Sequence, residues 1–377
     1  MKIALFCDTY KPVKNWLVSM VSHIKSSLEV EGHEVYLFCP DYPDYIDTEK
    51  NIFRIKSVWT PLKLDDRLPI TLKKKKEIKQ FLIEKNIDVI HSHSEFILGR
   101  LAKKFAKELN IKYIHTFHTM WEDYAHYLMM PKISIRKVVQ HFLKNVEYIT
   151  SPSIKSCWYL KQVLRRDDII HIPNFIDEWK LRRSAKKNSI NILKDKYNIT
   201  HDDIIVSFVG RVSSEKRVFE LVKTYDTYIF PKNKHIKLII IGDGKQFKKI
   251  QKYIAKSIYK NNYILTGYIE WEHINMYYKL SDIYTTISIS ETHPMTVTEA
   301  VFLWLPCVVV EDDSFHGLVT DGVNWYIWKD AQDYSSKILS LASEPETRKK
   351  FTKESKKIAK SYISKNIIKK YIELYEI

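Results

Sequence analysis

The sequence is poor in glycine, with 8 glycines among 377 residues, whereas glycine makes up about 7% of an average protein. Two of them lie in IIIGDGK, residues 239–245, directly after an apolar run. That stretch lacks both the full dinucleotide fingerprint and the lysine–serine pair of a P-loop. Taken alone, it predicts only a turn after a strand.

Long apolar runs and clustered cysteines are also missing. No stretch approaches about 18 uninterrupted apolar residues, so no transmembrane helix is predicted. The N-terminal MKIALFCDTYKP is too short and too soon acidic for a secretory signal, and predicts a first strand. The four cysteines have no metal or redox spacing, which favours reduced core thiols in a cytosolic protein. They are Cys7, Cys39, Cys157 and Cys307.

Positive charge, in contrast, is in excess, with a formal net charge of +16 at pH 7. Such a balance suits an anionic partner, which could be a nucleic acid, an anionic membrane surface or a phosphorylated substrate. No recognised nucleic-acid-binding module is visible, and the order of elements is that of a metabolic enzyme. We therefore expect no nucleic acid partner.

Apolar strand-like runs alternate with helical segments along the chain. KIALFCD, EVYLFCP, IFRIKSVW and DVIHSH begin one series, and DIIVSFVGR, KLIIIGDG, YILTGYI and IYTTISIS begin a second. This βαβ alternation predicts parallel sheets covered on both faces. The polar residues 177–200 between the two series are interpreted as a connector. The sequence thus predicts an α/β protein of two Rossmann-like domains with a cleft between them.

Candidate site residues follow strands in both halves of the chain. His93, His118, Arg211, Gly242 and Glu291 all come at or just after the ends of predicted strands. Ligands of open α/β sheets bind beyond the carboxyl ends of the strands. This shared placement is a stronger signal than any of the single motifs.

VGRVSSEKRVFEL places Arg211 just after a strand and Lys216 at the entry to a helix. Two fixed cations there could neutralise a diphosphate, and arginine can bind it with two hydrogen bonds. A solvated basic turn is the competing interpretation. ETHPMTVTE places Glu291 before a helix whose first position suits Pro294, with Glu299 about a turn and a half inside. A helix N-terminus there is an anion site, unless both acids are simply solvated.

DVIHSHSEF and KYIHTFHTMWEDYAHY concentrate histidines at strand ends. His91 and His93 could bind zinc, but no third ligand has a suitable spacing. Packed histidines are the simpler interpretation, and a His118 that orients a reacting group is the sharper one. The stretch WEDYAHYLMM, with its aromatic residues, methionines and Asp123, could line an apolar ligand or serve only in packing.

The segment after Pro69 predicts a basic amphipathic helix. Its apolar positions are Ile70, Leu72, Ile78, Phe81, Leu82 and Ile83, and its lysines include Lys73, Lys74, Lys75, Lys76 and Lys79. Such a helix can lie on an anionic membrane, gaining roughly 1 kcal/mol per lysine near the surface. The alternative is a helix that covers the core and exposes a lysine face to solvent.

These motifs together resemble the retaining nucleotide-sugar glycosyltransferases of family 4, which have the GT-B fold, and among them the bacterial diacylglycerol glucosyltransferases. ETHPMTVTE fits the E-x7-E element of that family, and VGRVSSEK fits its arginine–lysine phosphate clamp. IIGDG and LTGYI fit the next two strand ends, and the two histidine stretches match the acceptor region. The resemblance covers essentially the whole chain, with five motifs in the family's order.

The resemblance implies the domains and the roles of the candidate residues. It implies an acceptor domain of residues 1–173, completed by a C-terminal helix of about residues 360–377, and a donor domain of residues 174–359. Glu291 would hold sugar hydroxyls, Glu299 the ribose, Arg211 and Lys216 the leaving diphosphate, and His118 the reacting sugar. The other implied donor contacts are Gly210, Gly242, Pro294, Met295, Thr296 and Trp16. The implied membrane or acceptor contacts are Lys73, Lys74, Lys75, Lys76, Trp121, Asp123 and Tyr124.

The same resemblance implies a nucleotide-sugar donor, with UDP-glucose expected, and a lipid acceptor, with 1,2-diacylglycerol expected. No metal and no other cofactor is expected, because fixed cations and a helix N-terminus would take the leaving-group charge. The protein would bind peripherally to the anionic inner face of the cell membrane.

The chain departs from the family at several glycines. Trp16, Phe175 and Trp325 stand where the family has glycine, and Pro294 replaces a glycine whose N–H would face the donor. Glycine lets a backbone approach a phosphate closely, and proline lacks the N–H donor. Two alternatives to the glucolipid transferase therefore stay open. One is a catalytically degenerate partner subunit of another transferase, and the other is a transferase with a polysaccharide or protein acceptor.

Overall fold

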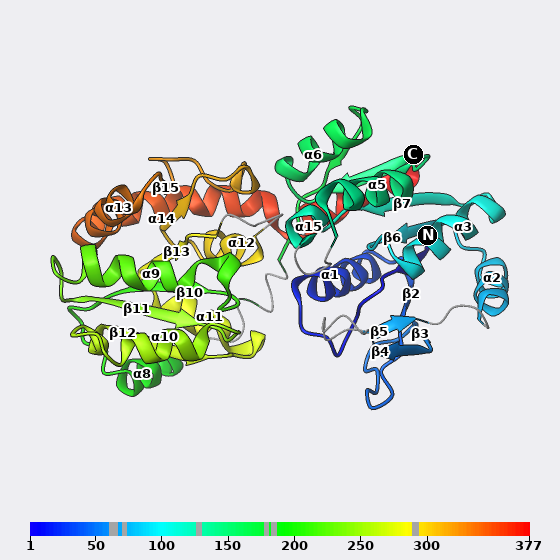
Figure 1. Ribbon diagram of the computed structural model, residues 1–377. Helices are drawn as coiled ribbons and strands as arrows, with labels where there is room; N and C mark the ends of the chain where they lie inside the picture. The colour runs from blue at the N-terminus through cyan, green and yellow to red at the C-terminus, as the bar shows by residue number, and fades with distance from the viewer. Residues whose placement is uncertain (60–66, 70–73, 126–129, 177–180, 182–186, 289–293) are drawn as a thin grey trace. The chain divides into compact units, whose positions relative to one another are not determined.

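The computed structural model describes residues 1–59, 67–69, 74–125, 130–176, 181, 187–288 and 294–377. The chain divides into two compact units (Figure 1). Unit 1 comprises residues 1–175 and 364–377, and unit 2 comprises residues 176–363. The unit boundaries fall two residues after the expected end of the first domain and four residues after the expected start of the last helix.

Unit 1 is a parallel seven-stranded sheet in the order β3-β2-β1-β6-β7-β8-β9. Its strands are β1 Lys2–Phe6, β2 Glu34–Pro40, β3 Ile52–Ile55, β6 Val89–Ser92, β7 Lys112–Thr116, β8 Tyr148–Ser151 and β9 Ile170–His171. The small antiparallel pair β4 Ser57–Trp59 and β5 Arg67–Pro69 lies apart from this sheet. The run expected as one strand, IFRIKSVW, is therefore divided between two sheets at Lys56.

Helices cover both faces of the first sheet. They are α1 Trp16–Val30, α2 Lys75–Glu84, α3 Ile97–Leu109, α5 Lys132–Leu143, α6 Ile154–Leu164 and α15 Ser364–Glu376, with the short turn η1 Trp121–Tyr124. The alternation of side chains along β1 shows the two faces. Ile3 and Leu5 pack into one apolar cluster with α1 and α15, whereas Ala4 and Phe6 pack into another with α2 and α3. Figure 1 shows α15, at the red end of the chain, beside α1.

Unit 2 is a parallel six-stranded sheet in the order β12-β11-β10-β13-β14-β15. Its strands are β10 Ile204–Val209, β11 Ile236–Ile241, β12 Tyr263–Gly267, β13 Ile283–Thr286, β14 Cys307–Val310 and β15 Trp325–Trp328. Its helices are α8 Lys187–Lys196, α9 Val218–Thr224, α10 Phe247–Ile254, α11 Trp271–Leu280, α12 Met295–Phe302, α13 Ala331–Ser343 and α14 Pro345–Ala359. The remaining short turns are η2 Ser214–Lys216, η3 Tyr225–Ile229, η4 Lys260–Asn262, η5 Asp313–Phe315 and η6 Lys360–Tyr362. The two predicted Rossmann-like domains of an α/β protein are confirmed.

Two expectations about local structure are wrong. Part of the expected connector is helix α8, because Ile190 and Leu193 pack into the core of unit 2. Pro294 is the cap residue before α12 rather than its first helical residue. The four cysteines are free and buried, as expected.

Within the described residues, no helix is both long enough and apolar enough to cross a membrane.

Candidate active site

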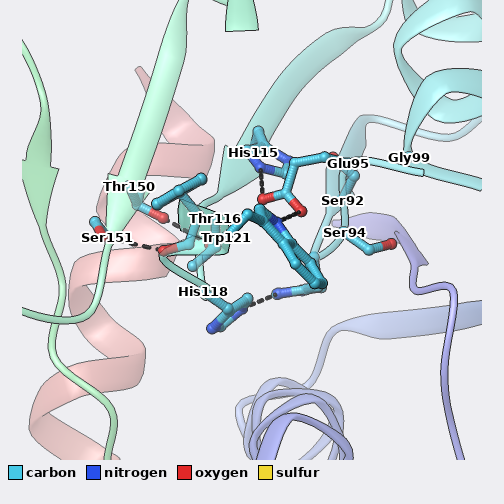
Figure 2. A network of polar contacts seen from close by, with 12 residues as sticks. Ser92, Ser94, Glu95, Gly99, His115, Thr116, His118, Trp121, Thr150 and Ser151 are labelled. Atoms are coloured by element: carbon cyan, nitrogen blue, oxygen red, sulfur yellow. Dashed lines mark hydrogen bonds and ion pairs between the residues drawn. The ribbon is translucent and has the colours of Figure 1, made fainter. Parts of the chain in front are cut away.

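Polar side chains gather where the strands of the first sheet end, because the carboxyl ends of parallel strands meet at one edge (Figure 2). At this edge the Glu95 carboxylate accepts hydrogen bonds from His115 Nε2, at 3.2 Å, and from Trp121 Nε1, at 2.9 Å. The other ring nitrogen of His115 lies 2.8 Å from Ser92 Oγ. Glu95 and His115 are both buried. The predicted acceptor residue Trp121 is thereby fixed to the strand ends through Glu95.

The remaining histidines of this edge form a row. His91 Nδ1 lies 2.7 Å from the Tyr375 hydroxyl, and the His91 and His93 rings are 4.1 Å apart. His93 Nδ1 lies 3.0 Å from His118 Nε2. Burial lowers the pKa of His91 far below its usual value, and burial with the nearby His115 lowers the pKa of His93 to about 3. Both rings are therefore neutral at physiological pH and can exchange hydrogen bonds with uncharged partners.

Zinc was the alternative use of these histidines. Among the residues that the structure describes, no group of three His, Cys, Asp or Glu side chains is placed to hold a metal ion. The ring nitrogens that have partners are directed at hydroxyl groups, at Glu95 or at each other. The histidine row is thus a hydrogen-bonded network in this structure.

Trp16, expected at the donor, begins α1 after the cap residue Asn15, whose side chain accepts a hydrogen bond from Val18 N. The Trp16 ring approaches His118 edge-on, with ring centroids 5.6 Å apart. A bulky ring is therefore beside His118, where the family would have a glycine. Asp123 is exposed on η1, which also includes the backbone of Tyr124.

Two acids at this edge were missed by the sequence interpretation, namely Glu95 and Asp8. Asp8 lies two residues after the end of β1 and accepts hydrogen bonds from the backbone N–H of Leu98 and from Ser94 Oγ. Desolvation by its surroundings raises the pKa of Asp8 to about 6. The backbone at Ser94 and at Gly99 comes so close that glycine is required, because a Cβ on Gly99 would lie 1.7 Å from the Ser94 carbonyl oxygen. An acid just after an apolar strand was the available signal.

The corresponding edge of the second sheet is built from backbone. Gly210, Gly242 and Gly267 follow or end β10, β11 and β12, and all have positive φ. Gly210 N donates to Ile241 O at 3.0 Å, and Gly242 N donates to Gly267 O at 2.9 Å. A Cβ on Gly242 would lie 2.0 Å from the Gly210 carbonyl oxygen. At Gly242 the loops pack so closely that only glycine fits, whereas a Cβ on Gly267 would meet no atom within 4 Å.

The two predicted phosphate-binding cations lie beside this backbone. Arg211 is exposed and its guanidinium lies 3.6 Å from the Glu215 carboxylate. Lys216 ends η2 and is half-buried. Burial acts to raise the pKa of Glu215, but the hydrogen bond from Ser213 and the charges of Arg211 and Lys216 outweigh it and hold that pKa below its usual value. Glu215 is therefore charged and restrains Arg211.

Glu299 is buried, which excludes the interpretation of a solvated helix acid. Tyr278 donates to one of its carboxylate oxygens at 2.7 Å, and Trp271 Nε1 lies 3.4 Å from the other. Burial raises the pKa of Glu299 to about 7, although both hydrogen bonds act to lower it. A buried carboxylate with directed donors is suited to binding polar hydrogens of a ligand.

The rest of the predicted donor element is only partly described. Glu291 lies outside the described residues. Pro294 is buried, while Met295 and Thr296 are half-buried in the first turn of α12. The Tyr284 hydroxyl donates to Thr296 Oγ1 at 2.9 Å.

The predicted basic helix is α2, and part of its apolar side is covered. Ile78 and Leu82 are buried in the core of unit 1, and the Phe81 ring packs 4.4 Å from Phe53. Lys74 and Lys76 are exposed and Lys75 is half-buried, while Lys73 lies outside the described residues. Ile83 is 48% exposed, and Ile70 and Leu72 lie outside the described residues. The helix therefore covers the core with part of its apolar side, and its binding to a membrane stays a prediction.

Comparison with known proteins gives the class of this molecule. The family described as Glycosyltransferase Family 4 matches residues 18–180, and the family described as Glycosyl transferases group 1 matches residues 189–358. The chain therefore belongs to the glycosyltransferases, with a family 4 domain followed by a group 1 domain. This match agrees with the resemblance carried by the strand-end motifs.

Among characterised relatives, two alpha-monoglucosyldiacylglycerol synthases are similar over most of the chain. The Acholeplasma laidlawii protein is 27% identical over 100% of this chain and 96% of its own. The Streptococcus pneumoniae protein is 28% identical over 92% of this chain and 79% of its own.

Solved glycosyltransferase structures have the same fold. A glycosyltransferase from Rickettsia africae aligns with a TM-score of 0.78 at 16% identity, covering 100% of this chain and 98% of its own. Anabaena HepE in complex with UDP-glucose aligns with a TM-score of 0.78 at 15% identity, covering 100% and 99%. The GT-B fold is thereby confirmed.

Proposed function

We propose that this glycosyltransferase transfers a hexose, glucose from UDP-glucose, to diacylglycerol with retention of the anomeric configuration. The observation that carries the proposal is the edge of the second sheet, where close-packed glycine backbone lies beside Arg211 and Lys216. Two cations suit a diphosphate, and glycines beside them put no side chain in its way. The lipid acceptor is supported by the two monoglucosyldiacylglycerol synthases that match the chain nearly end to end.

In the proposed reaction, the acceptor hydroxyl oxygen attacks the anomeric carbon from the face that the leaving group departs. The bond from that carbon to the diphosphate oxygen breaks, and a diphosphate oxygen accepts the hydroxyl proton. Arg211 and Lys216 stabilise the charge that develops on the diphosphate, so the step is proposed to need no metal and no other cofactor. Glu291 holds sugar hydroxyls, Glu299 the ribose, and His118 lies beside the reacting sugar.

The proposed location is the inner face of the cell membrane, where the protein binds peripherally. A net charge of +16 favours an anionic surface. Attraction through exposed lysines is screened within about 8 Å at physiological salt, so binding should weaken as salt rises or as anionic lipid is diluted.

The test is transfer from radiolabelled UDP-glucose, and in parallel from UDP-galactose, to diacylglycerol in anionic vesicles with and without EDTA. Glu291→Ala is assayed beside the wild type. We expect a glucolipid that EDTA does not reduce and that the variant does not make. If product forms from UDP-galactose and not from UDP-glucose, the donor is UDP-galactose. A normal yield from Glu291→Ala would contradict the assigned site.

A second candidate is a catalytically degenerate subunit that partners another transferase. The contact between the Trp16 ring and His118 favours it, because a large side chain stands beside the proposed reacting sugar. The two hydrogen bonds that already occupy Glu299 point the same way. This candidate predicts negligible UDP-glucose binding by calorimetry, and a micromolar dissociation constant would exclude it.

A further inference from the structure

The outer face of α5 combines exposed apolar and basic side chains. The inner face of this helix packs into the core through Ile135, Val139, Phe142 and Leu143. On the outer side, Ile133 is 57% exposed and Val138 is 41% exposed. Lys132 and Lys137 are also exposed and directly precede Ile133 and Val138 in the sequence. Met130, which is 41% exposed, lies just before the helix. We call Met130, Lys132, Ile133, Lys137 and Val138 the α5 face.

Exposing large apolar side chains to water has a cost that a soluble surface normally avoids. A surface that combines them with lysines therefore needs a partner that contacts both kinds of side chain. A bilayer interface does so, because apolar side chains enter the boundary of the acyl chains while lysines meet anionic headgroups. An acidic protein would satisfy the lysines alone, and an apolar groove would satisfy the isoleucine and valine alone.

The lysine-rich helices α2 and α10 differ from α5 in this respect. On α2, Ile78 and Leu82 are buried, and Ile83 is the one large apolar side chain that is exposed among its described residues. Its lysines approach acids, with Lys74 3.9 Å from Glu77 and Lys79 2.7 Å from Glu108. Around α10 the sequence has six lysines and no acid between residues 244 and 269. The large apolar side chains exposed in that stretch are Ile258, at 88%, and Tyr268, at 53%, and both lie outside α10. Only the α5 face joins several exposed apolar side chains with lysines on one helix surface within the described part of unit 1.

The α5 face is also tied to the histidine network. Arg136 on α5 donates to both carboxylate oxygens of Glu122, each at 2.8 Å, and Tyr159 on α6 donates to the same carboxylate at 2.7 Å. Glu122 belongs to η1, next to Trp121, which donates to Glu95. The Phe96 ring meets Trp121 edge-on with centroids 4.8 Å apart and is itself partly exposed.

We propose that the α5 face, and not α2, is the surface by which this protein docks on an anionic lipid bilayer. The inference rests on the proposed function, because a diacylglycerol hydroxyl lies at the bilayer interface and has to be brought to the histidine network. Docking through α5 places the bilayer beside η1, so that Trp121 and Phe96 form the entry for the lipid acceptor.

Three single-cysteine variants of the full chain test the placement, each labelled with an environment-sensitive fluorophore. They are Ile133→Cys on α5, Ile83→Cys on α2 and Ile258→Cys after α10, all at exposed isoleucines. The four native cysteines are free but buried, so the introduced thiol reacts first. We expect vesicles of phosphatidylglycerol and phosphatidylcholine to blue-shift and brighten the label at 133 only. A response at 83 or 258 without one at 133, or no retention by these vesicles, overturns the proposal.

Retention measurements add a second readout that needs no label. Ile133→Asp should lower the fraction bound to the same vesicles about tenfold at physiological salt. Ile258→Asp, the matched change at a more exposed isoleucine, should leave it unchanged. Equal loss in both variants would mean that charge alone governs binding and would overturn the role of the apolar face.

These readouts require no sugar transfer, so they separate this inference from the proposed function. A label response at 133 in a protein that makes no glycolipid would sustain the docking surface and contradict the reaction. Glycolipid synthesis with an unresponsive label at 133 would sustain the reaction and contradict the docking surface.

Discussion

The carboxyl edges of the two sheets differ in the groups that form them, which are side chains in one sheet and backbone in the other. The edge of the first sheet consists of buried polar side chains. Three of its histidines form a row, and a fourth, His115, is hydrogen-bonded to Glu95. The edge of the second sheet is made of glycine backbone, with Gly210, Gly242, Gly244 and Gly267 all at positive φ. Half of the glycines in a glycine-poor chain are thus kept at one edge.

The difference teaches how each edge can act on a ligand. Side chains fixed in a network present oriented imidazole and indole groups, which suits positioning a hydroxyl for reaction. Glycine backbone leaves space at the strand ends, which suits a diphosphate that needs close approach. The first edge should therefore tolerate conservative side-chain replacement, whereas the second should not tolerate an added Cβ where loops touch.

The largest expected effect is the loss of turnover in Lys216→Ala. Removing a fixed cation that stabilises the leaving diphosphate should lower kcat by about 10² to 10³. Lys223→Ala, at an exposed lysine on the nearby helix α9, is the matched control and should keep normal turnover. Initial rates with saturating UDP-glucose measure both, and circular dichroism checks that each variant is folded. Equal rates for the two variants would remove Lys216 from the site.

The backbone edge is tested by Gly242→Ala. A Cβ 2.0 Å from the Gly210 carbonyl oxygen forces the two loops apart, and the residue has φ +137°. Strain and displacement together should lower the free energy of unfolding by about 3 kcal/mol. At Gly267, φ is +69° but no atom lies within 4 Å of the added Cβ, so Gly267→Ala should cost about 1 kcal/mol. Urea denaturation would distinguish them, and equal losses would contradict the close-packed edge.

The pH response of Glu299 sharpens the comparison. Burial raises its pKa from 4.5 to about 7, so the protonated form stabilises the fold below pH 4.5 and that stability is lost as the pH rises through 7. The loss amounts to about 3 kcal/mol. Relative to Glu299→Gln, which has no charge to bury, the wild type should become less stable between pH 4.5 and 8. Urea midpoints measured across this range test it, and parallel curves would mean that Glu299 stays charged at low cost.

The histidine edge should respond to pH in the opposite direction. Burial lowers the pKa of His93 from 6.5 to about 3, so the stability from its neutral ring is present above pH 6.5 and is lost as the pH falls toward 3. Compared with His93→Asn, the wild type should lose stability on acidification. Asp8 titrates at the same edge, with its pKa raised to about 6. The test is therefore the difference in the free energy of unfolding between the wild type and His93→Asn, in which the contribution of Asp8 cancels.

The smallest effect concerns the hydrogen bond between His93 and His118. His93→Leu should lower kcat about tenfold, because the loss of about one hydrogen bond leaves His118 without its 3.0 Å partner at Nε2. His93→Asn can place an amide near the same position and should recover most of the rate. Similar rates for both variants would show that His93 only fills space.

Much of the fold could be predicted because parallel strands that are buried on both faces have continuous apolar sequences. The apolar runs KIALF and IKLIII became β1 and β11, and the polar residues that follow them became the candidate site. Helix α8 could not be recognised in the same way, since only Ile190 and Leu193 of its polar sequence reach the core.

Other features depend on which surface meets which. The amphipathic pattern of α2 is equally suited to a membrane or to a protein core, and only the packing of Phe81 on Phe53 showed that part of it meets the core. Trp304 adopts the left-handed φ of +67° after α12, with Lys356 placed 4.2 Å from its ring centroid. No local rule assigns that conformation to tryptophan. Glu95 gained its role only when Trp121 and His115, distant in sequence, were brought to it.

The position of α15 has a consequence for how the protein is made. Tyr371 and Tyr375 on this last helix belong to the core of unit 1, and Tyr375 contacts His91 at its centre. Residues 176–363 must leave the ribosome before that core can close, which at ordinary elongation rates takes ~10 s or more. Unit 2 can therefore finish folding before unit 1, although it is translated later. Until α15 has been made, the core of unit 1 stays incomplete and accessible to chaperones.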